Sequence, residues 1–426
     1  MSDLPIELGR RIAAECPEAY FVGGCVRDLL RGEAIKDVDL SLAGDTHRIG
    51  RALAKEFSGH VFWLHQEEGV VRVVLPEHGG LQLDLSPLRG TIEQDLHTRD
   101  LTINALAIAA ADGLRVDAPI IDTEGGQADL EARTVRFCSP ESPVKDPLRT
   151  MRALRFRWKL DFRLAEGATE LIRECVPLLS RVSVERVRDE LFQLLGIAQP
   201  HLALDECLSF GMGRWLTGVD AHATQGDGWA GPAGQVESIL ELLRNTPPDL
   251  HRVLQTQPTP PRSRRELLFW AAAIQGFGAA VVPDAAARYL ALSNDEKQLI
   301  VKGLSGAAQI VRLECWPVPG RVRYRLFRSV SAAGPEAVLL ASARAGEWTN
   351  AHAELLDEAL RRHFWPEAPL LTGLEVMQLL NVGPGPQIGQ TLEEIEEARA
   401  DGILRTKPDA VEWLRTRNHT VAPAHR

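Results

Sequence analysis

The stretch FVGGCVRD at residues 21–28, followed by DVDLSL at residues 37–42, decides the fold at the start of this chain. A short strand over Tyr20–Val22 is predicted to end in two glycines, with a helix over Cys25–Leu30 directly behind them. Glycines let a backbone approach a ligand closely, and the amides at a helix N-terminus attract phosphate. Arg27 lies one turn into that helix, where its guanidinium could contact a phosphate. The candidate phosphate-binding residues are Gly23, Gly24 and Arg27, and the alternative is a plain tight turn.

The second stretch places two carboxylates on one face of a predicted strand. Asp37 and Asp39 are two residues apart, so their side chains point to the same side. Such a pair repels unless a cation lies between its members, and oxygen ligands suit Mg²⁺, which also shares substrate phosphates. Asp84 interrupts an apolar alternation in LQLDL. It is either a third metal ligand from a neighbouring strand or a structural partner for Arg89.

The rest of residues 1–135 alternates short strand patterns with helical ones, which predicts a small α/β head. Three further strands and one amphipathic helix are predicted, over His60–His65, Val70–Leu75, Leu81–Leu85 and Asp45–Phe57. Residues 91–110 are predicted to be largely helical. Within them, Arg99, Asp100 and Asn104 recur at helical spacing. The functional interpretation places Arg99 on phosphate and the other two near a sugar, whereas the alternative is a solvated charged face.

From residue 136 onward strand patterns fade and helical periodicity dominates. The segment KDPLRTMRALRF at 145–156 predicts that Asp146 and Arg149 share a helix face. Arg149, Arg152 and Arg155 would then form a basic stripe, unless Asp146 is a cap on a solvated helix. The prediction is an α+β chain, in which a head (1–135) precedes a helical neck (136–200) and an elongated all-helical body and tail (201–426). The Gly-rich and Pro-rich segments 217–234 and 245–262 are predicted to be loops.

Composition narrows the class of protein. The 426 residues carry a formal net charge of −10 and are 45% apolar, which is typical of a globular protein. This charge argues against a broad polybasic nucleic-acid coat, so any such contact needs a local patch like the arginine stripe. Six cysteines without a CxxC pair indicate a reducing cytoplasm. No apolar run approaches the length of a membrane span, so no membrane partner is expected.

Five ordered segments resemble the bacterial class II tRNA nucleotidyltransferase and poly(A) polymerase family, within the polymerase β superfamily. They are FVGGCVRDLLRG, KDVDLSL, EQDLHTRDLTINALAI, DTEGGQADLEARTVRF and KDPLRTMRALRF. The resemblance implies metal binding by Asp37 and Asp39, and a triphosphate grip by Gly23, Gly24 and Arg27. It also implies sugar and phosphate contacts by Arg99, Asp100 and Asn104, and base reading by Asp146 and Arg149 with Arg152 and Arg155 behind them. Glu185, Arg186 and Glu190 resemble the helical motif that supports the base-reading helix, and residues after 200 are expected to bind RNA.

The resemblance implies a template-independent RNA 3′-terminal nucleotidyltransferase that adds C and/or A residues to tRNA, using CTP or ATP and Mg²⁺. An aspartate acceptor beside an arginine donor matches cytosine and adenine but not uracil or guanine. The family usually carries a longer flexible loop where only 90–94 intervene here, and that loop helps the switch from C to A addition. Its shortness favours a partial enzyme, such as one adding only CC, or a relative with another tailing role. The alternatives are a poly(A) polymerase and a non-catalytic RNA-binding paralogue.

Overall fold

The structure, a computed structural model, describes residues 4–35, 37–220, 231–244 and 246–421. They form two compact units, and the division between them falls inside one helix, after Glu190. The first unit contains the residues up to Glu190 with Ile197–Gln199 and Ser209–Met212, and the second contains the remainder. The first unit therefore includes the predicted head and most of the predicted neck, and the three-part division remains a prediction.

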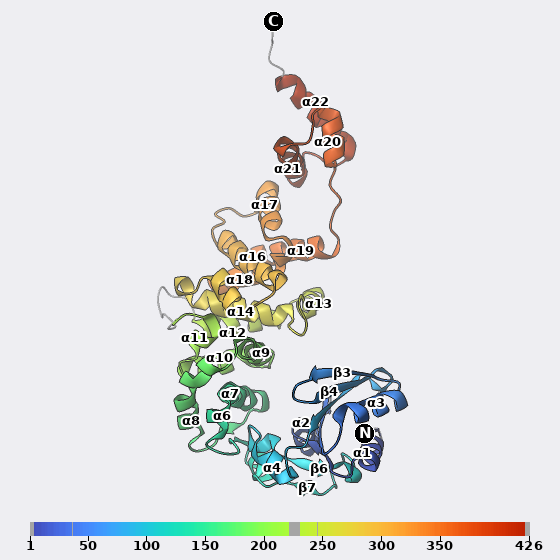
Figure 1. Cartoon of the computed structure of the whole chain (residues 1–426). Coiled ribbons are helices and arrows are strands. Elements are labelled where there is room, and N and C mark those ends of the chain that lie inside the picture. The colour runs from blue at the N-terminus through green and yellow to red at the C-terminus, as the bar shows by residue number, and fades with distance from the viewer. Residues whose placement is uncertain (1–3, 36, 221–230, 245, 422–426) are drawn as a thin grey trace. The chain divides into compact units, whose positions relative to one another are not determined.

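A seven-stranded sheet organises the first unit (Figure 1). Its order is β3-β4-β5-β2-β1-β6-β7, in which β2 and β5 run parallel and every other neighbouring pair is antiparallel. The strands are β1 (Ala19–Val22), β2 (Asp37–Leu42), β3 (His60–His65), β4 (Val70–Leu75), β5 (Leu81–Pro87), β6 (Ala107–Ala109) and β7 (Ile120–Ile121). The strands expected over residues 20–22, 37–42, 60–65, 70–75 and 81–85 are confirmed.

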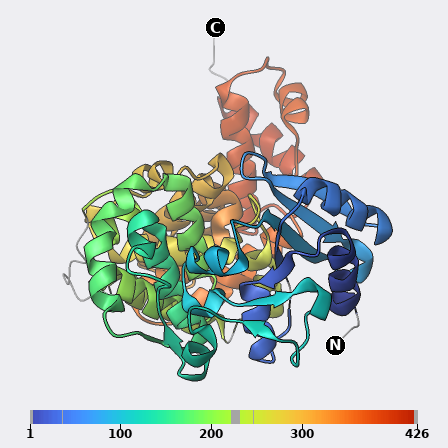
Figure 2. The same ribbon diagram turned by 60° about the horizontal axis from the view of Figure 1, so that its bottom comes forward.

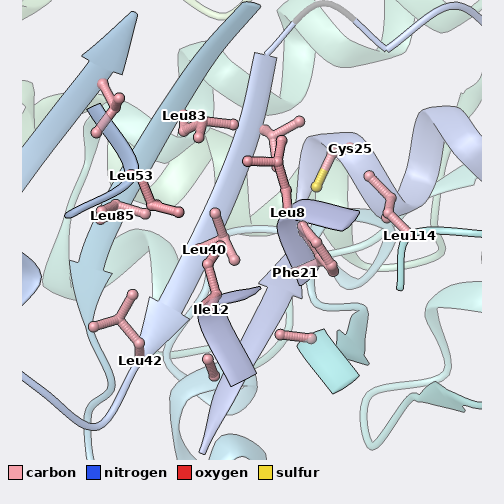
Figure 3. Packing of buried hydrophobic residues seen from close by; sticks show 14 of the residues in the cluster. Leu8, Ile12, Phe21, Cys25, Leu40, Leu42, Leu53, Leu83, Leu85 and Leu114 are labelled. Carbon is pink, nitrogen blue, oxygen red and sulfur yellow. The ribbon is translucent and has the colours of Figure 1, made fainter. Parts of the chain in front are cut away.

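One face of this sheet is buried by helices, as the alternation of its strands dictates. Leu40 and Leu42 of β2 and Leu83 and Leu85 of β5 point to one side, where they meet α1 (Leu4–Glu15), α2 (Gly24–Leu30) and α3 (Thr46–Glu56) (Figure 3). Asp45 caps α3, because its carboxylate accepts a hydrogen bond from the Arg48 amide at 2.9 Å. The polar alternate residues of β2 and β5 consequently face the other side of the sheet.

The predicted long helix over residues 91–110 is wrong. α4 (Ile92–His97) has only six residues, and it is followed by a 3₁₀ turn over Thr102–Asn104 and by β6. The Thr102 amide donates to the Arg136 carbonyl at 3.0 Å, and β6 pairs with β1 and β7. These long-range pairings outweigh the local helix preference of the sequence. Arg99, Asp100 and Asn104 consequently lie in a folded connection instead of on one helix face.

Helices make up most of the chain after β7. In the first unit these are α5 (Gly126–Glu131), α6 (Ser142–Lys145), α7 (Leu148–Leu160), α8 (Ala168–Cys175) and α9 (Val184–Leu195), with two short strands, β8 (Thr134–Val135) and β9 (Arg163–Leu164). α9 continues into the second unit, which is drawn mainly in yellow to red in Figure 2. The later helices are α10 (Pro200–Ser209), α11 (Gly213–Thr217), α12 (Pro232–Leu243), α13 (Pro248–Gln255), α14 (Arg264–Gly276), α15 (Pro283–Tyr289), α16 (Asn294–Val311), α17 (Gly320–Val330), α18 (Gly334–Ala345), α19 (Asn350–Phe364), α20 (Gly373–Leu380), α21 (Pro386–Ala400) and α22 (Lys407–Val421).

The α+β class, a mixed-sheet head followed by a mainly helical body, is confirmed. The predicted loops are partly wrong, because α12 and α13 begin inside them with Pro232 and Pro248 in their first turns, where proline is tolerated. Residues 221–230 and 245 of those predicted loops lie outside the described residues. Throughout the described chain, no helix is both long enough and apolar enough to cross a membrane.

Candidate active site

Three carboxylates, those of Asp37, Asp39 and Asp84, point to the sheet face opposite to α1, α2 and α3, which we call the open face, with an arginine beside them. Asp39 of β2 lies directly opposite Asp84 of β5, which lies opposite Arg72 of β4. Arg72 Nε and Nη2 donate to the two Asp84 carboxylate oxygens at 2.7 and 2.6 Å. The structural partner of Asp84 is therefore Arg72, not Arg89. A charge inside the apolar run VVRVVL was the sequence signal that could have revealed this pair.

Asp39 experiences an excess of negative charge. Burial, together with the charges of Asp84 and Asp37, raises its pKa to about 6, and the charge of Arg99 opposes this increase. A cation at the Asp37–Asp39 pair would relieve this repulsion, and two carboxylates are the hard oxygen donors that Mg²⁺ prefers. Both carboxylate oxygens of Asp84 already accept hydrogen bonds from Arg72. Within the described residues, no group of three or more His, Cys, Asp or Glu side chains is arranged to hold a metal ion. The donor set fits a metal that Asp37 and Asp39 would hold together with a substrate, and this assignment stays a prediction.

The double-glycine turn lies against this carboxylate. Gly23 precedes α2 with a φ of 72°, a conformation that favours glycine. A Cβ atom at Gly23 would lie 3.0 Å from Arg99 Nη1 and 3.7 Å from Asp39 Oδ2. A Cβ atom at Gly24 would lie 3.9 Å from the same Asp39 oxygen. The fold therefore brings together the predicted phosphate turn, the predicted phosphate arginine and the predicted metal ligand.

A buried network of polar side chains extends from this turn into the helices. Arg27 Nη1 donates to Asn104 Oδ1 at 2.5 Å, and Asn104 Nδ2 donates to Asp100 Oδ1 at 3.2 Å. Arg152 Nε donates to the other Asp100 oxygen at 2.8 Å. Burial alone would raise the pKa of Asp100, but Arg152 and the donors around the carboxylate hold it below its ordinary value. Arg27 is itself buried, so the network fixes its position.

The same network reaches α9 through the second half of α7. Arg155 Nε donates to Glu190 Oε1 at 2.5 Å, and Arg152 Nη1 lies 3.9 Å from Glu190 Oε2. The Phe156 ring, which sequence reasoning missed, has the guanidinium carbons of Arg155 and Arg27 at 4.5 and 5.0 Å from its centre. Arg152 and Arg155 therefore make contacts that fix the helix. Their direct contact with a nucleotide stays a prediction.

Asp146 and Arg149 do not share a helix face as predicted. Asp146 has extended backbone angles between α6 and α7, and its Oδ2 accepts from Arg186 Nη2 at 2.7 Å. Arg149, in the first turn of α7, donates from Nη1 to the Arg99 carbonyl at 3.0 Å and from Nη2 to the Thr98 carbonyl at 2.9 Å. Pro147, between them, ends one helix and begins the next. Arg149 consequently ties the neck helix to the segment that carries Arg99, and the Arg186 contact agrees with a supporting role for α9.

A mixed sheet that carries a carboxylate pair beside a double-glycine turn defines a nucleotidyltransferase head. The family described as Poly A polymerase head domain matches residues 19–136, and the Probable RNA and SrmB-binding site of polymerase A matches residues 161–216. A CC-adding tRNA nucleotidyltransferase of Geobacter sulfurreducens is 33% identical over 95% of this chain and 93% of its own. An A-adding tRNA nucleotidyltransferase of Deinococcus radiodurans is 30% identical over 92% and 94%. This chain belongs to the tRNA nucleotidyltransferase and poly(A) polymerase family, and it is a nucleotidyltransferase.

Solved structures share the fold. The Bacillus stearothermophilus CCA-adding enzyme in complex with CTP has a TM-score of 0.71 and 24% identity, covering 99% of both chains. The Thermotoga maritima CCA-adding enzyme complexed with tRNA has a TM-score of 0.66 and 23% identity, covering 97% of this chain and 95% of the other. The order of sheet and helices found here is therefore that of these enzymes.

Proposed function

We propose that this chain is a CC-adding enzyme, which transfers CMP from CTP to the 3′ end of tRNA with Mg²⁺ held by Asp37 and Asp39. The observation that carries the choice of CC is the short connection between β5 and α4. β5 ends at Pro87 and α4 begins at Ile92. The Thr91 hydroxyl accepts from the Gln94 amide at 3.4 Å, and Gln94 Oε1 accepts from the Thr91 amide at 3.1 Å. This reciprocal cap closes the segment tightly.

Only residues 88–91 connect β5 to α4, so this connection is too short to be the long flexible loop that helps related enzymes switch from C to A addition. The similarity to the Geobacter enzyme over nearly the whole of both chains supports the same choice. A-adding activity is the second candidate, favoured by the similarity to the Deinococcus enzyme. The six cysteines, all free among the described residues, support a reducing cytoplasm as the place of reaction.

The reaction is an attack of the RNA 3′-oxygen on the α-phosphate of CTP, which breaks the α–β bond and releases pyrophosphate. Bound Mg²⁺ supplies charge stabilisation and lowers the pKa of the attacking hydroxyl. Arg99, half-buried beside Gly23 and Asp39, holds the triphosphate in this proposal, and the buried Arg27 supports the turn, since its amide donates to the Gly23 carbonyl at 3.1 Å. Such chemistry depends mainly on positioning and charge stabilisation. Asp146 and Arg149 read the cytosine edge, since an acceptor and a donor match its amino group and ring nitrogen.

The test uses three tRNA acceptors that lack CCA, lack CA or lack only A, with labelled CTP or ATP supplied separately in Mg²⁺. The first two acceptors should gain two and one residues from CTP, and ATP should extend none of them. Extension of the third acceptor by ATP would establish A addition instead, and a long A tail would establish a poly(A) polymerase. Asp39→Ala should abolish all transfer while the circular dichroism spectrum stays unchanged. Full activity of that variant would refute the metal assignment.

A further inference from the structure

The open face of the sheet carries a row of side chains that continues past the carboxylates to its edge. Asp39, Asp84, Arg72 and Phe62 lie directly opposite one another on β2, β5, β4 and β3. Residues in register on neighbouring strands point to the same face. Phe62 therefore lies on the same face as Asp39, three strand spacings away, which is about 14 Å at the usual ~4.8 Å per strand.

Different kinds of side chain flank Asp39 toward β1 and toward β3. On the β1 side lie Gly23, Gly24 and Arg99, the residues that fit a triphosphate. The side toward β3 holds Arg72 and Phe62. Because the attacking oxygen and the departing pyrophosphate lie roughly in line on opposite sides of the α-phosphate, an acceptor strand must approach from the side opposite to the triphosphate grip.

Phe62 is 45% exposed, and the neighbouring Trp63 is 38% exposed. Their environments nevertheless differ. Trp63 points to the helix-covered face, where its ring stacks on His47 of α3, with ring centres 4.7 Å apart and planes inclined by 11°. Phe62 lies opposite Arg72, a half-buried guanidinium whose position Asp84 fixes. An exposed aromatic ring beside a fixed arginine is the combination on which single-stranded nucleic acid stacks.

We propose that Phe62 and Arg72 form a platform for the single-stranded 3′ end of the acceptor RNA. This proposal rests on the proposed function and assigns the side from which its acceptor arrives. The ribose of the terminal nucleotide lies at Asp39, and a base a few positions back stacks on Phe62. A separation of about 14 Å corresponds to about four nucleotides at the ~3.4 Å rise of a stacked strand, and to fewer in an extended one. Arg72 offsets the charge of Asp84, and the part of its guanidinium that does not contact Asp84 contacts a base or a phosphate of the RNA.

The experiment compares Phe62→Ala with the matched control Trp63→Ala, which removes a similarly exposed aromatic ring from the same strand but from the opposite face. The dissociation constant of a tRNA lacking only the terminal A, whose 3′ end is single-stranded over more than one nucleotide, is measured in EDTA without CTP, so the readout does not depend on catalysis. Loss of one stacked base should weaken binding about tenfold in Phe62→Ala. Trp63→Ala should change the dissociation constant of the tRNA less than about twofold. The KM for CTP should stay unchanged in both variants.

Two further variants separate stacking from packing. Phe62→Tyr should restore RNA binding, whereas Phe62→Leu, which is apolar but cannot stack, should not. Equal weakening by both alanine variants, or an increase in the KM for CTP without a change in RNA affinity, would overturn the platform. A change in oligomeric state of Phe62→Ala with RNA binding intact would mark the β3 edge as a protein interface and would also overturn it. If the wild type binds the tRNA but adds A instead of CC, the proposed function fails while this test remains decisive.

Discussion

The substitution Gly23→Ala tests whether the double-glycine turn exists for a close approach to the triphosphate site. Its φ of 72° makes an alanine strained, at a cost of about 1–2 kcal/mol. The new Cβ atom would also lie 3.0 Å from Arg99 Nη1, which must then move. Arg99 donates to Asp95 Oδ2 from Nη2 at 3.1 Å and from Nε at 3.3 Å, and to Ser41 Oγ from Nη2 at 3.4 Å. Loss of one charge-assisted contact to phosphate is worth about 1.5–3 kcal/mol, so the KM for CTP should rise roughly 10- to 100-fold.

Gly32→Ala is the matched control. Gly32 has a φ of 69°, but no atom lies within 4 Å of the position of its Cβ. Both variants should therefore lower the midpoint of the first urea-unfolding transition by a similar amount, and only Gly23→Ala should impair CTP use. Steady-state kinetics with CTP varied at saturating tRNA provide the comparison. If the two variants raise the KM for CTP equally, the close approach of Gly23 to Arg99 has no role in nucleotide binding.

Three further outcomes are expected from the same site. Burial, Asp84 and Asp37 raise the pKa of Asp39 to about 6, so the stability that its proton provides is present below about pH 4 and lost as the pH rises through 6. Metal-free wild type should therefore lose about 3 kcal/mol relative to Asp39→Asn between about pH 4 and pH 7, and parallel stability–pH curves for the two proteins would contradict this. Glu190→Ala removes the carboxylate from the buried Arg155 and should destabilise the first unit by about 3–5 kcal/mol in thermal unfolding; a loss below about 1 kcal/mol would show that water replaces the pair. Arg149→Ala should reduce the preference for CTP over UTP by about tenfold or more, measured as a ratio of kcat/KM, and an unchanged ratio would exclude base reading by that side chain.

Local pattern was enough to predict much of the head. Alternating apolar residues placed β2, β4 and β5 correctly, because one face of each strand had to be buried. The helix predicted over residues 91–110 failed, because its second half pairs with β1 and the Arg136 segment, which a short window of sequence cannot reveal. The prediction that Asp84 would pair with Arg89 failed for the same reason. Arg72 is close to Asp84 only because β4 and β5 pair in one particular register.

The sequence by itself determined the class of the molecule and predicted the residues at its centre. The spacing of Asp37 and Asp39 on a strand, and the two glycines before a helix, prescribe local geometry that any packing must keep. Tertiary structure alone decided which charges meet, since Arg27, Asn104, Asp100 and Arg152 come from three separate segments and contact one another only in the folded chain. It also decided which aromatic ring shares the open face with Asp39. The physical reason is that strand register and helix packing join residues far apart in the chain, and no local pattern specifies those joins.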